Sequence, residues 1–167
     1  MTPEEFHTHY PGLIGWIRAT LAAHKPDARP VASAGFARLP RYFSKELLAS
    51  SKFVAVDRAP TPPLAALGLS RFAAFALSDP DGITYLDTFF VRRGRATDEG
   101  LHFHELIHVV QWRLLGPENF LAAYAAGLEG FGYRDSPLER VAYDAQASFA
   151  LGQIFDAERL VAQKLSN

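Results

Sequence analysis

The stretch HFHELIHVVQ, residues 102–111, places three histidines and one glutamate among large apolar side chains. Its apolar residues recur with the period of an α-helix, so we expect a helix here. At about 100° per residue, one side of this helix is apolar: Phe103, Leu106, Ile107, Val110 and Leu114. The other side carries the polar residues His104, Glu105, His108 and Gln111. A helix this apolar is expected to be largely buried, and buried polar side chains need partners.

Residues 104–108 spell H-E-x-x-H, a pattern typical of zinc sites. Because residues four apart share one face of a helix, His104 and His108 can both reach one cation. The neighbouring Glu105 can reach a water molecule bound to that cation. The chain has no cysteine, so a transition metal must be held by histidine, aspartate or glutamate. We therefore expect a Zn²⁺ site on this helix.

A second interpretation is a metal-free core helix whose histidines bond backbone or carboxylate groups. His102 lies away from the polar side of the helix, so we expect it to be a surface or capping histidine and not a metal ligand. Ordinary surface positions are expected for His7, His9 and His24.

Two histidines alone hold catalytic zinc poorly, and a third protein ligand is usual. No histidine follows His108, so that ligand should be one of the downstream carboxylates: Glu118, Glu129 and Glu139. Glu139 is the best candidate because it shares a helical stripe with Tyr143 and Gln146, in a segment with small residues. Ser136 and Glu139 also spell a capping box, in which the glutamate would bond back to the helix start. The residues alone leave these two roles of Glu139 equally open.

The composition describes one ordinary globular domain. A chain of 167 residues is long enough for one domain with a core and too short for two. Hydrophobic residues make up 49% and charged residues 21%, and the formal charge of −1 favours neither nucleic acid nor an acidic membrane surface as a partner. The acidic start of the chain predicts no signal peptide, and no stretch has the roughly 20 apolar residues of a membrane span. We expect a cytoplasmic protein.

Caps and hydrophobic periods predict the elements around the central helix. For residues 1–57 they predict a helix from Thr2 and Pro3 that Pro11-Gly12 interrupts, a connection at 25–42 with a short strand near Val31, a short helix capped by Ser44, and a strand at 52–57. For the rest they predict a loop at 58–70, strands at 71–78 and 82–93 joined by the turn SDPDG, a long helix from Thr97 to about Gly116, a helix at 118–128, a glycine-rich loop at 127–133, and a last long helix from Ser136. This order predicts an α+β fold with a small antiparallel or mixed sheet.

The segments HELIHVVQW (104–112), GPENFLAAY (116–124) and GYRDSPLERVAYDAQ (132–146) resemble the small gluzincin-type members of the zincin metallopeptidase superfamily. Those proteins combine an H-E-L-x-H-x-x-Q helix with a glutamate on a later helix, commonly within a pattern like N/S-P-x-E-x-x-A. The resemblance covers about residues 82–150, and the first 80 residues carry none.

The resemblance implies a zincin-like fold in which His104, His108 and Glu139 bind Zn²⁺, Glu105 is the general base, and a peptide or protein is the substrate. It also suggests that residues 83–93 form the strand above the active-site helix, whose edge aligns an extended peptide in larger relatives. Four side chains near that strand are candidates for shaping the cleft, although a half-buried strand with a solvated basic end is the better expectation for each: Phe89, Phe90, Arg92 and Arg93.

The chain departs from the family pattern at two points. Many gluzincins have an aspartate one turn after the glutamate ligand, where this chain has Tyr143. The residue that orients the histidines is therefore open among Asp87, Asp98 and Gln111. No histidine remains downstream to stabilise an oxyanion, which leaves four candidates, with Tyr143 taken first: Tyr143, Tyr133, Arg134 and Arg140.

These patterns together predict a single zincin-like α+β domain over residues 1–167, with a helical or irregular part at 1–60 and a metal-site core at 70–150. The expected function is zinc-dependent hydrolysis of a peptide bond with Glu105 as the general base. The alternative is a zinc-binding domain of the same fold with little or no turnover, used as a binding or regulatory module.

Overall fold

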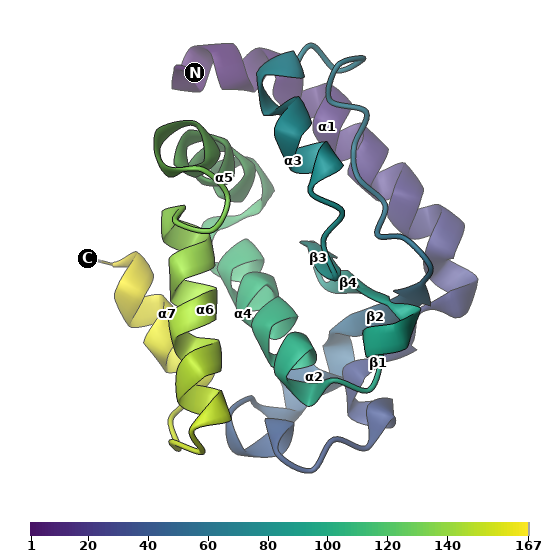
Figure 1. Ribbon diagram of the computed structural model, residues 1–167, viewed down its shortest axis with the longest axis vertical. Coiled ribbons are helices and arrows are strands. Elements are labelled where there is room, and N and C mark those ends of the chain that lie inside the picture. The colour runs from purple at the N-terminus through teal and green to yellow at the C-terminus, as the bar shows by residue number, and fades with distance from the viewer. Residues whose placement is uncertain (167) are drawn as a thin grey trace.

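The computed structural model describes residues 1–166, apart from the side chain of Ala76. These residues form seven α-helices and a four-stranded sheet, which confirms the α+β class (Figure 1). The helices are α1 (Pro3–His24), α2 (Lys45–Ser50), α3 (Ala73–Leu77), α4 (Glu99–Leu115), α5 (Pro117–Phe131), α6 (Pro137–Ala150) and α7 (Ala157–Leu165). The strands are β1 (Arg29–Pro30), β2 (Lys52–Val56), β3 (Gly82–Tyr85) and β4 (Thr88–Arg92). Within residues 1–166, no helix combines the length and apolar character that crossing a membrane requires.

The sheet is mixed and has the strand order β1-β2-β4-β3. The strands β2 and β4 are parallel, whereas the β1–β2 and β3–β4 pairs are antiparallel. Successive strand residues point to opposite faces, so Phe89 packs on the α4 side of the sheet and Phe90 on the α1 side. Both rings are fully buried. The sheet therefore separates two apolar cores, and β3 forms one of its edges.

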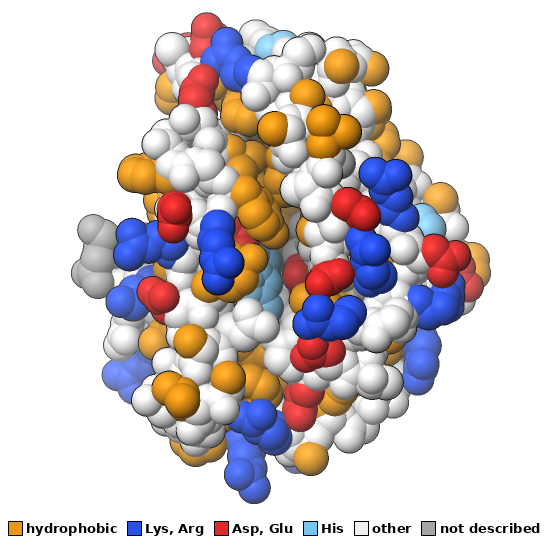
Figure 2. Space-filling view, in the orientation of Figure 1, with side chains coloured by type: hydrophobic (Ala, Val, Ile, Leu, Met, Phe, Trp, Pro, Cys, Tyr) orange, Lys and Arg blue, Asp and Glu red, His pale blue; other side chains and the backbone are white. Residues whose placement is uncertain are grey.

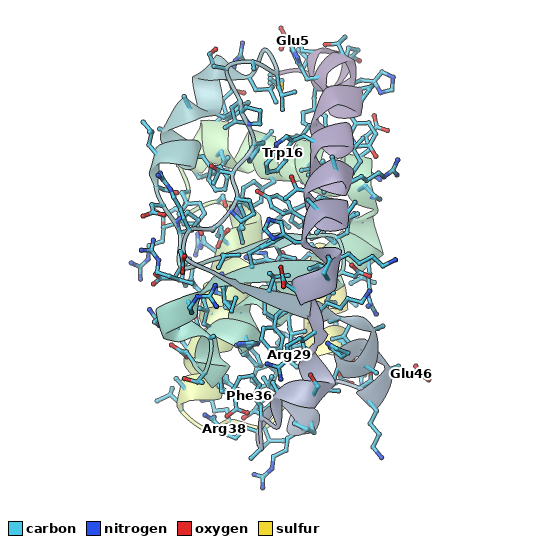
Figure 3. The ribbon with its side chains drawn as sticks, turned by 90° about the vertical axis from the view of Figure 1, so that its right-hand side faces the viewer. Glu5, Trp16, Arg29, Phe36, Arg38 and Glu46 are labelled. Carbon is cyan, nitrogen blue, oxygen red and sulfur yellow. The ribbon has the colours of Figure 1, made fainter. Side chains whose placement is uncertain are left out.

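Helix α1 covers one face of the sheet and α4 covers the other. Figure 3 views the molecule from the side of α1, where Trp16 lies on the edge of the Tyr85 ring at a centroid distance of 5.6 Å. Helix α4 is the central element in Figure 1 and contacts β3, β4, α5, α6 and α7. Almost its whole length is buried, on the polar side as well as the apolar side, although Leu114 at its end is 52% exposed.

Several helix boundaries follow from the expected caps. Thr2 and Glu5 form a capping box at α1, and the Ser44 hydroxyl accepts a hydrogen bond from the backbone N–H of Leu47 in α2. Helix α4 is capped by Asp98, one residue later than the expected start at Thr97, and it ends at Gly116 as predicted. The predicted strand at 52–57 is confirmed as β2, and the short strand β1 lies next to Val31.

The prediction that Pro11-Gly12 interrupts the first helix is wrong, because α1 is continuous through Pro11. A proline inside a helix removes one hydrogen bond and crowds the preceding turn. Here Phe6 on one side of Pro11 and Leu13 and Ile17 on the other are buried in the same core. Burial of one continuous apolar face outweighs the cost of the proline.

The predicted hairpin around SDPDG is also wrong. Residues 71–78 form a helical turn and α3, and the hairpin is β3–β4, which turns at Leu86 and Asp87. Alanine-rich sequence has high helix propensity, which favours a helix in the first of the two segments. The second segment, predicted as one strand, contains two strands, because GITY pairs with TFFVR. The edge strand beside α4 is consequently β3 alone.

The glycines of 127–133 lie mostly inside α5, where a loop was expected, and the last helical region is divided into α6 and α7. Gly127 is buried against the start of α6, and a Cβ atom there would stand 3.0 Å from Cβ of Ser136 and 3.1 Å from Cδ of Pro137. The missing side chain lets α6 begin close to α5.

Replacing Phe103 with alanine tests the central position of α4. The Phe103 ring is fully buried and stacks on Phe149 at a centroid distance of 4.5 Å. We expect a loss of about 3–5 kcal/mol in the free energy of unfolding, measured by chemical denaturation. Leu114→Ala on the same helix is the control and should cost about 0.5 kcal/mol or less. Equal losses for the two variants would contradict the described packing.

Candidate metal centre

The side chains of His104, His108 and Glu139 converge where α4 packs against α6. The two histidine Nε2 atoms are 3.2 Å apart. Oε2 of Glu139 lies 3.3 Å from Nε2 of His104 and 3.4 Å from Nε2 of His108. The exposed fractions of the three residues are only 4%, 6% and 2%. Three atoms that commonly bind metals thus meet in one buried place.

A glutamine side chain orients each histidine ring. Gln146 donates to a backbone carbonyl at the start of α4, which turns its Oε1 towards Nδ1 of His104 at 3.1 Å. Gln111 donates to a backbone carbonyl at the start of α6 and turns its Oε1 towards Nδ1 of His108 at 2.8 Å. Because an amide oxygen only accepts hydrogen bonds, each Nδ1 carries the hydrogen. Each Nε2 therefore faces the other atoms of the group, and in the neutral imidazole it carries the lone pair.

The charges of the converging groups favour a cation between them. Burial by itself would lower the pKa of His108, but the Glu139 carboxylate, together with Glu105 and Gln111, outweighs burial and raises that pKa to about 9. Although burial would raise the pKa of Glu139, the two histidines hold that pKa well below its ordinary value. Oε2 of Glu139 is buried and has no hydrogen-bond partner among the described residues. The donor set, two imidazole nitrogens and one carboxylate oxygen, could hold a metal ion.

Tyr124 of α5 fixes the remaining oxygen of the glutamate. Its hydroxyl donates to Oε1 of Glu139 at 2.7 Å, which leaves Oε2 facing the histidines. Burial raises the pKa of Tyr124 well above its ordinary value, so this hydroxyl keeps its proton. The residues that hold a ligand in place are often as important to metal affinity as the ligands themselves.

The structure decides between the two roles left open for Glu139. The Ser136 side chain makes no capping hydrogen bond to α6, and the Glu139 carboxylate points to α4. The capping-box interpretation is therefore wrong. The other two glutamates lie elsewhere on the surface: Glu118 contacts His7 at 2.6 Å, and Glu129 pairs with Arg71 at 2.9 Å.

Glu105 lies against the edge strand β3. The Thr84 hydroxyl donates to Oε2 of Glu105 at 2.7 Å. A Cβ atom added to Gly82 would stand 2.4 Å from Oε1 of the same carboxylate, so only glycine leaves room for it. Burial raises the pKa of Glu105 above its ordinary value, against the two histidines and the Thr84 hydroxyl, which lower it. This carboxylate is placed tightly beside the ligand group.

The candidates for stabilising an oxyanion occupy different places. The Tyr143 ring packs on the His104 ring at a centroid distance of 4.6 Å, with the Arg134 guanidinium 5.2 Å from the Tyr143 centroid. Tyr133 lines the cavity beside Glu105 and Glu139, and burial raises its pKa. Arg140 is exposed on the side of α6 that faces α7. Tyr143 and Tyr133 are therefore brought to the site, and Arg140 is not.

His102 is fully buried, so the prediction of a surface or capping histidine is wrong. Its ring lies against Phe36, Phe53 and Phe89, with centroid distances of 4.6, 4.8 and 5.2 Å. Its Nε2 is 2.9 Å from the backbone carbonyl of Ala96. Burial lowers its pKa, which favours the neutral form. His102 is a core histidine and not a member of the ligand group.

Most of the remaining candidates make no contact with His104 or His108. Asp98 caps α4 and Asp87 accepts a hydrogen bond from Thr88, so of the three orienting candidates only Gln111 contacts a ligand. Phe89 and Phe90 are in the cores, Arg92 pairs with Asp79 and Arg93 with Asp57. A half-buried strand with a solvated basic end was the expectation for these four. The basic end is partly exposed, but both phenylalanines are fully buried.

Sequence reasoning missed the roles of Gln146, Tyr124, Thr84 and Gly82. Gln146 had been placed on the helical stripe of Glu139, and that stripe was the available signal for its role. The other three approach the site from α5 and β3, which only the folded chain brings next to α4.

A cleft leads to the ligand group from the surface. Figure 2 shows it as a hollow down the middle of one face, with histidine and acidic atoms visible inside it and orange side chains along its upper part. The cavity at this place is lined by Glu105, His108 and Glu139 at one end. Solvent and a ligand can therefore reach the group.

No protein family model matches this sequence, and neither a curated protein nor a solved structure is significantly similar to it. The function of the site is therefore inferred from its geometry and chemistry.

Removing the orienting amide should weaken metal binding without removing a ligand. We expect Gln146→Leu to lower metal affinity by roughly 10-fold to 100-fold, because the His104 ring loses the partner that fixes its tautomer. Competition with a chromophoric chelator measures the change. Gln163→Leu, at an exposed position of α7, is the matched control and should leave affinity unaltered. Unchanged affinity in Gln146→Leu would show that this amide does not orient the ligand.

Proposed function

We propose that this chain is a zinc-dependent peptidase of the gluzincin type, in which His104, His108 and Glu139 hold the metal and Glu105 is the general base. The convergence of two histidine Nε2 atoms and one buried Glu139 oxygen within 3.4 Å of one another carries the proposal. The H-E-x-x-H helix with a glutamate on a later helix, which resembles the gluzincin pattern, supports the choice of family.

The spacing of the three atoms supports zinc as the metal. Ligand atoms about 2.0–2.1 Å from a tetrahedral zinc ion stand about 3.3 Å apart. The observed separations are 3.2, 3.3 and 3.4 Å. Two imidazoles and one carboxylate also form a common catalytic zinc set that leaves a fourth position for water or substrate.

The proposed chemistry is hydrolysis by an activated water molecule. When bound, zinc supplies Lewis acidity, which lowers the pKa of water and polarises a carbonyl oxygen. Glu105 takes the proton of the attacking water and delivers it to the leaving amine. The Thr84 hydroxyl bonds to its carboxylate, and the missing side chain of Gly82 leaves room for the carboxylate in this orientation. Tyr143 is the proposed hydrogen-bond donor to the developing oxyanion, with Tyr133 as the second candidate.

The position of β3 supports a peptide as the substrate. This strand is at the edge of the sheet, and its residues Gly82 and Thr84 touch Glu105. An extended peptide that paired with this edge would run past the general base. The arrangement of helix, edge strand and later glutamate is the basis for proposing a zincin-like fold.

The test combines metal content with cleavage. We expect about one zinc per chain in the wild type by elemental mass spectrometry, and little in His104→Ala and Glu139→Ala prepared in the same way. The zinc-loaded wild type should cleave members of a diverse peptide pool analysed by mass spectrometry. Glu105→Gln should keep its zinc and lose cleavage by at least about 1,000-fold, because the general base is removed.

The outcomes separate the rival functions. Zinc that survives Glu139→Ala would move the third ligand elsewhere. Zinc binding with no cleavage by the wild type would favour the binding or regulatory module. An absence of zinc after reconstitution would contradict the metal site itself.

A methyl group at position 82 should disturb the general base alone. We expect Gly82→Ala to keep its zinc but to lower kcat at least tenfold, because the new Cβ would occupy the place of the Glu105 carboxylate. Gly15→Ala, where an added Cβ meets nothing within 4 Å, is the control and should behave like the wild type. Full activity of Gly82→Ala would mean that this contact does not position Glu105.

A further inference from the structure

The cleft continues from the ligand group into an apolar pocket of about 90 Å³. The pocket lies between α1 and α5, and the edge strand β3 forms part of its wall. Representative wall residues come from each of these elements: Leu13, Ile17, Ile83, Phe120, Ala125 and Leu128. Because Glu105, His108 and Glu139 line the same cavity, a group in this pocket lies next to the proposed reaction.

Most of the polar groups in the pocket wall already have partners inside the protein. They are the hydroxyls of Thr84 on Glu105, Tyr85 on the Pro60 carbonyl and Tyr124 on Glu139, and the indole N–H of Trp112 on the Thr84 carbonyl. A polar side chain that entered away from the metal group would lose its water and find few hydrogen-bond partners in return. The pocket therefore discriminates against amides and hydroxyls as well as charges.

Away from the proposed metal group, the pocket wall offers no charge to a charged side chain. The acidic and histidine residues of the wall are Glu105, His108 and Glu139, all at the metal group, and none of the described lining residues is lysine or arginine. A charged side chain that entered would lose its water among apolar walls, which is unfavourable.

The volume limits the size of the group that fits. A cavity of roughly 150 Å³ is known to bind benzene in a protein core. A pocket of about 90 Å³ suits a smaller group, of the size of one aliphatic side chain. Resting on the proposed peptidase function, we infer that this pocket binds a leucine or methionine side chain of the substrate beside the bond that is cleaved.

The first test compares leucine with asparagine, which has nearly the same shape but is polar. In the peptide pool, the zinc-loaded wild type should cleave beside leucine or methionine at least tenfold faster than beside asparagine or aspartate at the same position. Equal rates for leucine and asparagine at every position around the cleaved bond would overturn the inference.

Filling the pocket provides the matched variants. Ala125→Phe places a ring in the pocket and should reduce cleavage beside leucine at least tenfold, whereas Ala126→Phe at the exposed neighbouring position should not. Thermal unfolding shows whether Ala125→Phe is folded. If Ala125→Phe is not folded, Leu128→Ala is used in its place. This variant enlarges the pocket and should shift the cleavage preference from leucine towards phenylalanine. Unchanged specificity in the folded variant that is used would overturn the inference.

A binding measurement separates this inference from the proposed function. N-acetyl-leucine amide and N-acetyl-asparagine amide are titrated into the zinc-loaded Glu105→Gln variant, with chemical shifts followed by NMR. The leucine compound should bind at least tenfold more tightly than the asparagine compound, and adding Ala125→Phe should abolish its binding. This result would support the pocket even if the wild type cleaves no peptide. Cleavage that depends on Glu105 but shows no aliphatic preference would leave the peptidase standing and overturn the pocket.

Discussion

Two imidazole nitrogens and one carboxylate oxygen are held within 3.4 Å of one another, almost fully buried, at the contact of α4 with α6. Such an arrangement is favourable only when a positive charge lies among the three atoms. The surrounding residues direct these atoms towards one another: the two glutamines fix the rings and Tyr124 fixes the carboxylate. The helices around the group can pack closely because their other faces are apolar and buried in two cores.

The proposed general base belongs to the same helix as the histidines but is held by a different part of the fold. Glu105 follows His104 directly in sequence, yet its carboxylate rests on β3 through Thr84 and Gly82. The proposed ligands thus depend on the packing of α4 against α6, whereas the proposed base depends on the packing of α4 against the sheet. Under the proposed function, metal binding and proton transfer are consequently separable by mutation.

The sequence predicts the local features of this fold and site because they rest on nearby residues. The helix period, the caps at Thr2 and Ser44 and the end of α4 at Gly116 are of this kind. His104 and His108 share a face by their spacing alone. Errors arise where tertiary packing decides: α1 continues through Pro11 because both of its halves bury the same face, and His102 is enclosed by three aromatic rings from distant segments. The choice between capping and ligation for Glu139 likewise depended on which helix lies opposite.

The two orienting glutamines also brace the helices reciprocally. Gln111 of α4 holds the Leu138 carbonyl of α6, and Gln146 of α6 holds the Gly100 carbonyl of α4. Each helix therefore supplies a glutamine that orients one histidine and bonds to the backbone of the other helix. In this respect the fold resembles a preformed chelator, because the contacts that aim the three atoms run between the helices themselves.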